Sequence, residues 1–130
     1  MNLTKLIEKY FIPRQKAIEL YSTQAEVIQN HVFRKLIQKA ATTEWGMKYD
    51  YLHLHNYTDF QRVPIQNYEN IKYDVDRMRH GEKNILWPGK IKWYAKSSGT
   101  TNDKSKFIPV SKDGLSHIHY KGGTDAVALY

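Results

Sequence analysis

Apolar side chains recur at helical intervals through the first third of the chain. The set follows Pro13 and steps forward by 3, 4, 3, 4 and 4 residues: Ile18, Tyr21, Ala25, Ile28, Val32 and Leu36. This spacing places the side chains on one face of a helix that packs against a core. Pro13 suits the first turn of a helix and Gly46 follows its end, so we predict a single helix of about seven turns or fewer.

Two shorter helices are predicted in the following segment. Thr58-Asp59-Phe60-Gln61 has the form of a capping box, and Pro64 would close the short helix that it begins. Asn67 can cap a further helix that ends at Gly81. One face of this helix carries three apolar side chains, Ile71, Val75 and Met78. Residues 1–82 are therefore expected to be mainly helical.

The last third of the chain has the pattern of strands followed by a helix. Ile91 to Ala95 and Lys106 to Val110 are predicted as strands. Ser111 can cap a final helix that runs towards Leu129. Residues 83–130 are therefore expected to form a strand, a loop, a second strand and a helix.

The composition indicates a soluble intracellular protein. At 130 residues the chain is long enough for one domain with a core, and the absence of cysteine excludes disulfides and thiolate metal sites. Lys5, Glu8 and Lys9 interrupt the N-terminus, so it lacks the apolar stretch of a signal peptide. No uncharged apolar run approaches the roughly 20 residues that a membrane-spanning helix needs. We therefore expect a cytoplasmic protein without a membrane partner.

Positive charge is concentrated towards the C-terminal end. The net charge is +7, and the segment from Lys83 to Lys121 holds eight lysines against two acidic residues, whereas the remainder of the chain sums to +1. Such a field would attract a polyanionic ligand. A solvated lysine face that maintains solubility would give the same pattern, so charge alone does not decide between the two.

A run of small hydroxyl residues and glycine, followed by lysines, lies between the two predicted strands. The run comprises Ser97, Ser98, Gly99, Thr100, Thr101, Lys104 and Lys106. Small side chains let the backbone approach a ligand, and N–H, O–H and ammonium donors together suit phosphate oxygens. It is not a Walker A loop, because Lys104 and Ser105 occupy the places of the closing glycine and lysine. An ordinary polar turn would also explain the composition, but this loop is longer than a hairpin needs.

These residues resemble a known phosphate loop. Ser97 to Thr101, followed by Lys104, Lys106 and Ile108-Pro109, is similar to the loop of the adenylate-forming superfamily, which contains acyl-CoA synthetases, peptide-synthetase adenylation domains and luciferases. The continuation SKFIPVS is more similar to one branch, the auxin-responsive-promoter family of acyl-acid–amido synthetases. Four further stretches are similar to that family: TEWG from Thr43, FQRVPIQNY from Phe60, GEKNILW from Gly81 and HYKGGTDAVALY from His119.

The resemblance implies a fold and a reaction. The implied fold is α/β, with this chain as the N-terminal portion of the large adenylate-forming domain. In the implied reaction a carboxylate attacks the α-phosphate of ATP, pyrophosphate leaves, and the acyl group passes from the adenylate to the amine of an amino acid. The nucleotide pocket and the carboxylate that binds Mg²⁺ would follow Tyr130. Because the helical pattern also stops at Tyr130 without a cap or a polar tail, we expect a truncated chain that is inactive alone.

The resemblance also implies roles for individual residues. The expected donors to ATP phosphates are Ser97, Ser98, Thr100 and Thr101, with Gly99 allowing close approach and Lys104 and Lys106 offsetting negative charge. From its position in the last helix, and not from the resemblance, we expect Tyr120 to face the pocket for the carboxylic acid. Gly122 and Gly123 would permit close approach of a substrate or another backbone, although a kink or an end of the helix would explain them equally well.

Two other functions remain open. An acyl-CoA ligase of the same superfamily would share the first half-reaction and differ in its acceptor. A non-enzymatic basic domain would bind nucleic acid through lysines and aromatic rings, although the aromatic residues fit the apolar pattern and no nucleic-acid-binding motif is present. A metal site is not expected, because His117 and His119 would point to nearly opposite sides of a helix, and no third ligand accompanies the His53-Leu54-His55 stretch at a telling spacing.

Overall fold

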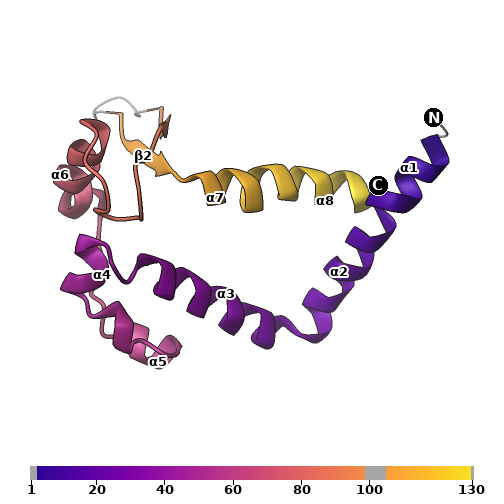
Figure 1. Ribbon diagram of the computed structural model, residues 1–130, viewed down its shortest axis with the longest axis horizontal. Helices are drawn as coiled ribbons and strands as arrows, with labels where there is room; N and C mark the ends of the chain where they lie inside the picture. The colour runs from indigo at the N-terminus through magenta and orange to yellow at the C-terminus, as the bar shows by residue number, and fades with distance from the viewer. Residues whose placement is uncertain (1–2, 99–104, 130) are drawn as a thin grey trace. The chain divides into compact units, whose positions relative to one another are not determined.

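The computed structural model describes residues 3–98 and 105–129, which form helices and one two-stranded sheet (Figure 1). These residues divide into two units. The first unit contains the residues up to His31 together with those from Asp113 onward. The second unit extends from Val32 to Lys112.

The helices are distributed over both units. The first unit contains α1 (Leu3–Tyr10), α2 (Ile12–Thr23), the beginning of α3 (Ala25–Ala40), most of α7 (Lys112–Gly114), the π-helical η2 (Leu115–Tyr120) and α8 (Lys121–Leu129). The second contains the rest of α3, α4 (Glu44–Lys48), the 3₁₀-helical η1 (Tyr51–His53), α5 (Tyr57–Phe60), α6 (Tyr68–Arg79), β1 (Trp93–Lys96) and β2 (Phe107–Val110). The described chain is thus a mixed helical structure with a small sheet.

The prediction of one continuous helix over the first apolar stripe is wrong, because α2 and α3 are separate helices. Gln24 lies between them and leaves helical geometry, with φ −127° and ψ 26°. The hydroxyl groups of Ser22 and Thr23 each donate to the carbonyl three residues earlier, at 2.7 and 3.4 Å. Side-chain hydroxyls that bond to the backbone compete with helical hydrogen bonding, which explains the interruption.

Polar side chains join α2 to α8 within the first unit. Arg14 forms a bidentate ion pair with Asp125, in which Nη2 lies 2.7 Å from Oδ2 and Nε contacts Oδ1. The Arg14 guanidinium lowers the pKa of the Asp125 carboxyl. Gln15 Nε2 donates to the carbonyl oxygen of Ala128 at 2.6 Å, and Ala128 is buried. Ion pairing and a backbone contact therefore hold the two helices together.

The predicted final helix is present, but part of it has π-helical rather than α-helical geometry. Helical structure continues from Lys112 through η2 to Leu129. The apolar spacing from which the helix was predicted does not separate a π turn from an α turn over six residues. π-Helical segments are rare and are frequent at functional sites.

A hydrophobic core in the second unit joins α4, α6 and the segment that precedes β1. Its buried residues are Trp45, Met78, Ile85 and Ile91. Ile71 packs against this cluster, and Val75 is fully buried, which confirms the apolar face predicted for α6. The predicted ends of α6 are also confirmed: Asn67 Oδ1 accepts from the backbone N–H of Asn70 at 3.0 Å, and Gly81 follows the helix with φ 101°.

The capping residue predicted for the short helix α5 is wrong. Asn56, not Thr58, is the N-cap, and its Oδ1 accepts from the backbone N–H of Asp59 at 3.0 Å. The helix begins earlier than the capping-box pattern indicated, because an asparagine side chain accepts this bond as readily as a threonine hydroxyl does.

Thr43 begins α4 and fixes the turn that follows α3. Its hydroxyl donates to the Ala40 carbonyl at 2.7 Å and accepts from the Gly46 N–H at 2.9 Å. A Cβ at Gly46 would lie 2.1 Å from the Ala40 carbonyl oxygen, so only glycine fits there without movement of the backbone. The α3 end and the α4 start are therefore packed backbone against backbone.

Side chains of α4 are tied to α6 and to the segment that follows it. Trp45 Nε1 donates to Asp74 at 2.8 Å, and the Glu44 carboxylate accepts from both Arg77 Nη atoms at 2.8 Å. The Arg77 guanidinium lowers the pKa of Glu44. The backbone N–H groups of the same two α4 residues donate to the carbonyls of Asn84 and Ile85 at 2.8 and 3.2 Å. The TEWG and GEKNILW stretches thus meet in space.

The two strands form an antiparallel hairpin. Trp93 pairs with Val110 at the open end, and Lys96 pairs with Phe107 at the end nearest the connecting residues. The second strand is confirmed to within one residue, whereas the first begins at Trp93 rather than at Ile91. Ile91 is 5% exposed and belongs to the core cluster, just before the first paired residue of the strand.

Candidate functional site

Three of the residues expected to bind phosphate are described by the structure, and they lie at the connected end of the β1–β2 hairpin. Ser97, Ser98 and Lys106 are among the described residues. Gly99, Thr100, Thr101 and Lys104 lie outside the described residues. The geometry of the site therefore comes from the two residues that leave β1 and the one that enters β2.

Ser97 and Lys106 close the hairpin. The Ser97 N–H donates to the Lys106 carbonyl at 3.0 Å, and the Lys106 N–H donates to Ser97 Oγ at 3.1 Å. Both backbone N–H groups are therefore used within the hairpin, and Ser97 offers a ligand its hydroxyl proton rather than its amide. Ser98 is exposed and follows directly.

Helix α6 holds β2 in place beside this closure. The Tyr68 hydroxyl accepts from the Phe107 N–H at 3.0 Å. The Lys106 ammonium lies 5.7 Å from the centroid of the Tyr68 ring, and the Arg79 guanidinium lies 3.6 Å from the centroid of the Phe107 ring. Cation–π contacts of this kind contribute roughly 0.5–1 kcal/mol each at exposed positions. The start of β2 is thus held by two residues of one helix, Tyr68 and Arg79.

The register explains how the hairpin accommodates Pro109. In an antiparallel ladder, hydrogen-bonded pairs alternate with pairs that exchange no backbone bond. Because the Ser97 N–H donates to the Lys106 carbonyl, this pair is a hydrogen-bonded one, and the alternation places the Tyr94–Pro109 pair in a non-bonded position. The missing N–H of proline therefore removes no ladder bond.

Tyr94 brings a polar atom into the hydrophobic core without a partner. Its hydroxyl oxygen is buried and has no hydrogen bond among the described residues. Burial raises the pKa of Tyr94, and the positive charge of Arg79 opposes that rise. The hydroxyl is therefore protonated and neutral near neutral pH.

The lysines of the basic segment do not all converge on the connected end of the hairpin. Lys90, Lys92 and Lys112 line a hollow of about 250 Å³ beside Trp93 and Val110, which form the pair at the open end of the hairpin. Three of the eight lysines counted in the sequence thus lie away from Ser97 and Ser98. The sequence predicts the net charge of this region but not its division between two ends.

Tyr120, Gly122 and Gly123, expected near the carboxylic acid, lie in the first unit. Tyr120 is 72% exposed and ends η2. Both glycines lie inside α8, and a Cβ at either would meet none of the described heavy atoms within 4 Å, outside its own helix and chain neighbours. The described residues therefore do not require glycine at these positions.

The histidines considered in the sequence do not come together in a metal site among the described residues. His53 ends η1, and its Nδ1 lies 2.7 Å from Asp50 Oδ1. His117 and His119 lie on η2. Within residues 3–98 and 105–129, no group of three or more His, Asp or Glu side chains could hold a metal ion.

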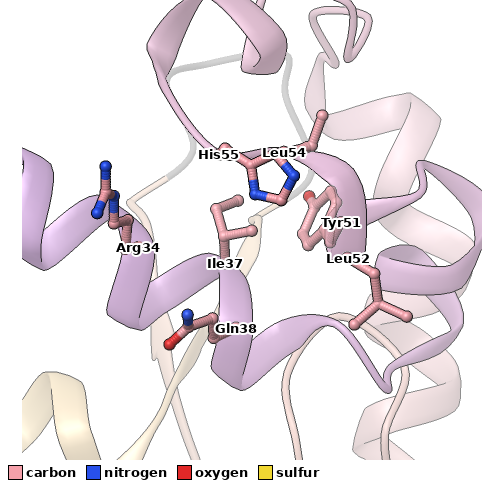
Figure 2. Close-up of a pocket in the computed structure, with 7 residues that line it drawn as sticks. All are labelled: Arg34, Ile37, Gln38, Tyr51, Leu52, Leu54 and His55. Carbon is pink, nitrogen blue, oxygen red and sulfur yellow. The ribbon is translucent and has the colours of Figure 1, made fainter.

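A pocket that the sequence patterns did not indicate lies between α3 and the segment around η1 (Figure 2). Its volume is about 470 Å³. Its lining residues are Arg34, Ile37 and Gln38 from α3, and Tyr51, Leu52, Leu54 and His55 from the second segment. Arg34, Ile37 and Gln38 follow the spacing of one helix face, which is the signal in the sequence, but nothing in the sequence indicates which segment lies opposite that face.

Comparison with known proteins identifies the family. The chain matches the GH3 family N-terminal domain over residues 14–128. It belongs to the GH3 family. The match confirms the resemblance of the loop and the four other stretches to acyl-acid–amido synthetases. It also extends that resemblance towards the N-terminus, to residue 14.

Relatives with similar sequences are synthetases by name. The chain is 25% identical over 109 residues to indole-3-acetic acid-amido synthetase GH3.4 of Arabidopsis thaliana, covering 82% of this chain and 18% of that protein. It is 30% identical over 123 residues to jasmonoyl–L-amino acid synthetase JAR6 of Nicotiana attenuata, covering 85% of this chain and 20% of that protein. The chain thus spans about a fifth of the length of these relatives. Among the described residues, no helix combines the length and apolarity needed to cross a membrane.

Proposed function

We propose that this chain contributes the phosphate-binding hairpin to an ATP-dependent acyl-acid–amido synthetase. The observation that supports the proposal most directly is the GH3 match over residues 14–128, because it includes the hairpin and the helix that anchors it. By their names, the relatives above are an indole-3-acetic acid-amido synthetase and a jasmonoyl–L-amino acid synthetase. We extend that chemistry to a carboxylic acid and an amino acid as the substrates here.

The proposed reaction has two balanced steps. A carboxylate oxygen of the acid attacks the α-phosphorus of ATP, and the bond to the bridging oxygen breaks with release of pyrophosphate. The amine of an amino acid then attacks the acyl carbon, AMP leaves, and the amine loses a proton. Catalysis of this type depends mainly on positioning and on stabilisation of charge.

The residues at the hairpin end fit a triphosphate chemically. Ser97 keeps a hydroxyl proton to donate, Ser98 presents an exposed hydroxyl, and neither position carries an acidic side chain that would repel phosphate. We propose that Gly99, Thr100, Thr101 and Lys104 complete the donor set. We expect Lys106 to contribute less to phosphate binding than these residues, because its ammonium already contacts the Tyr68 ring.

The proposed enzyme also needs a metal ion and a pocket for the carboxylic acid. We propose Mg²⁺ as the ion that accompanies ATP, and we assign no ligand for it among the described residues. We propose that Tyr120, with Gly122 and Gly123, lines the pocket for the acid; the π-helical geometry that ends at Tyr120 is frequent at functional sites.

The test is carboxylate-dependent exchange of pyrophosphate into ATP. It is measured on this chain and on the longest protein product of its gene, with a broad panel of acids. Exchange that requires an acid supports adenylation, and the product formed with an amino acid or with CoA separates the amido synthetase from a CoA ligase. Absence of exchange in both proteins across the panel would refute the proposal and return the basic surface to nucleic-acid binding tests.

Two variants address the hairpin itself. In the protein that shows exchange, we expect Ser98→Ala to reduce the rate more than Lys104→Ala does, because the hydroxyl would donate directly to phosphate whereas the ammonium acts over a longer range. Ser105→Ala is the matched control, since it removes a hydroxyl from the same connection that is outside the assigned set. Equal or reversed effects of Ser98→Ala and Lys104→Ala would contradict this ranking.

A further inference from the structure

The pocket between α3 and the segment Tyr51–His55 has an apolar floor. Ile37 and Leu54 are 6% and 7% exposed, and both line the cavity. Leu52 lines it as well and is largely exposed. With a volume of about 470 Å³, the cavity falls in the range of small-molecule sites, and its floor suits the hydrocarbon part of a ligand.

The polar lining residues offer mainly hydrogen-bond donors. They are Arg34, Gln38, Tyr51 and His55, and no Asp or Glu lines the cavity. Arg34 and Gln38 come from α3, with the Tyr51 and His55 rings on the other segment and Ile37 between the two sides (Figure 2). Burial raises the pKa of Tyr51, with a further rise from Tyr49, so its hydroxyl is protonated and can donate near neutral pH.

Nearby carboxylates are paired with other groups. Asp59 Oδ2 accepts from the His55 backbone N–H and its Oδ1 accepts from Arg62, both at 3.0 Å. Within the described part of the chain, Arg34 has no acidic partner. The one fixed charge of the lining is therefore positive and is available to an anion.

One wall of the pocket is held in place by aromatic packing. The Tyr51 ring lies 6.5 Å from the Phe60 ring, and Phe60 lies 5.6 Å from Phe33 on α3, both in edge-to-face geometry. Because Phe33 lies beside Arg34 in α3, this packing also fixes the distance between the two sides of the cavity. A wall that is already ordered lowers the entropy cost of binding.

We propose that this pocket binds a small organic carboxylate, with the carboxylate group on Arg34 and the apolar part over Ile37 and Leu54. A guanidinium forms paired, charge-assisted hydrogen bonds with a carboxylate, and this recognises the ligand more specifically than a lysine would. None of the hairpin residues lines this pocket. The proposal is therefore independent of the adenylation chemistry proposed above.

The test uses nuclear magnetic resonance titration of the 130-residue chain without ATP. Benzoate is the probe, benzamide is its neutral counterpart, and inorganic phosphate reports general attraction of anions. We expect benzoate to shift the methyl signals of Ile37 and Leu54, with benzamide binding more weakly by about tenfold or more, the loss expected when a hydrogen bond loses its charge assistance.

Variants identify the arginine. Arg34→Gln should weaken benzoate binding by about tenfold or more. Lys35→Gln is the matched control, because it removes the same charge from the adjacent, exposed position of α3 that does not line the pocket, and it should leave binding unchanged. Unchanged methyl signals with benzoate, equal binding of phosphate, or equal effects of the two variants would each overturn the proposal. Backbone spectra of both variants, compared with the unaltered chain, establish that each is folded.

Discussion

The hydroxyl of Thr43 provides a quantitative test of how the second unit is held together. Thr43→Val keeps nearly the same shape but removes the donor to Ala40 and the acceptor for the Gly46 N–H. The Ala40 carbonyl retains the Thr43 backbone N–H at 3.0 Å, so it keeps one partner. The Gly46 N–H is left buried without one. Loss of a cap costs about 1 kcal/mol, and a buried unpaired donor costs about 1–3 kcal/mol; since both figures describe the same lost bond, we expect about 2 kcal/mol in total.

Thr43→Ser is the control for this substitution. Serine keeps both hydrogen bonds and removes one methyl group from a side chain that is 0% exposed, which should cost about 0.8 kcal/mol. Urea unfolding followed by circular dichroism and tryptophan fluorescence measures both variants. With a slope of about 2 kcal/mol per molar urea, the midpoint should fall by about 1 M for valine and by less than half of that for serine. A valine variant as stable as the serine variant would show that the hydroxyl contributes nothing beyond its volume.

Three further predictions concern the hairpin and the first unit. Tyr94→Phe should leave the free energy of unfolding unchanged or raise it by up to about 1 kcal/mol, because the hydroxyl that it removes is buried without a partner; clear destabilisation in urea would reveal a hidden partner. Tyr68→Phe keeps the ring but removes the acceptor for the Phe107 N–H, so hydrogen exchange at Phe107 should accelerate about fivefold or more, and unchanged exchange would contradict the anchoring role. Asp125 has a lowered pKa when folded, so its ion pair with Arg14 stabilises the protein above the unfolded pKa of about 4 and is lost as the pH falls through the lower folded value. Asp125→Asn should therefore lower the melting temperature at pH 6 and lower it progressively less as the pH falls below about 4; an effect that did not depend on pH would count against the ion pair.

The sequence predicts those elements best whose signals are local. Asn67 and Gly81 mark the ends of α6, and both act as the pattern indicates, since a capping side chain and a left-handed glycine each act within one turn of the helix. The apolar face of α6 is also predicted correctly, because burial on one side of a helix leaves a repeat that needs no knowledge of the partner.

The failures arise where local signals compete or where the partner is distant. The apolar stripe of the first helix continues across Gln24, but hydroxyl groups just before it bond to the backbone and interrupt the helix. Asn56 and Thr58 both have the chemistry of a cap, and the pattern alone does not rank them. The pocket beside Arg34 depends on which segment packs against α3, and that pairing is not contained in the spacing of either segment.

The candidate phosphate site has both kinds of feature: some are visible in the local sequence, and others depend on a distant partner in the chain. Its residue types are visible in the sequence, and the family match supports the proposed chemistry. The sequence does not reveal that the Ser97 amide is used to close the hairpin, because this depends on the register with Lys106.

The stretches that carry the family resemblance divide into a scaffold and the segment that we propose binds phosphate. Thr43 and Gly46 fix the turn into α4, and the TEWG and GEKNILW backbones bond to each other. Tyr68, at the end of the FQRVPIQNY stretch, reaches β2 directly. Changes in these residues should therefore alter stability and the position of the hairpin together. Ser98 is exposed and contributes to no core, so its substitution should change phosphate chemistry while leaving the free energy of unfolding within about 0.5 kcal/mol of the unaltered chain. If Ser98→Ala destabilised the fold as much as Thr43→Ser does, this division would be wrong and the loop would belong to the scaffold.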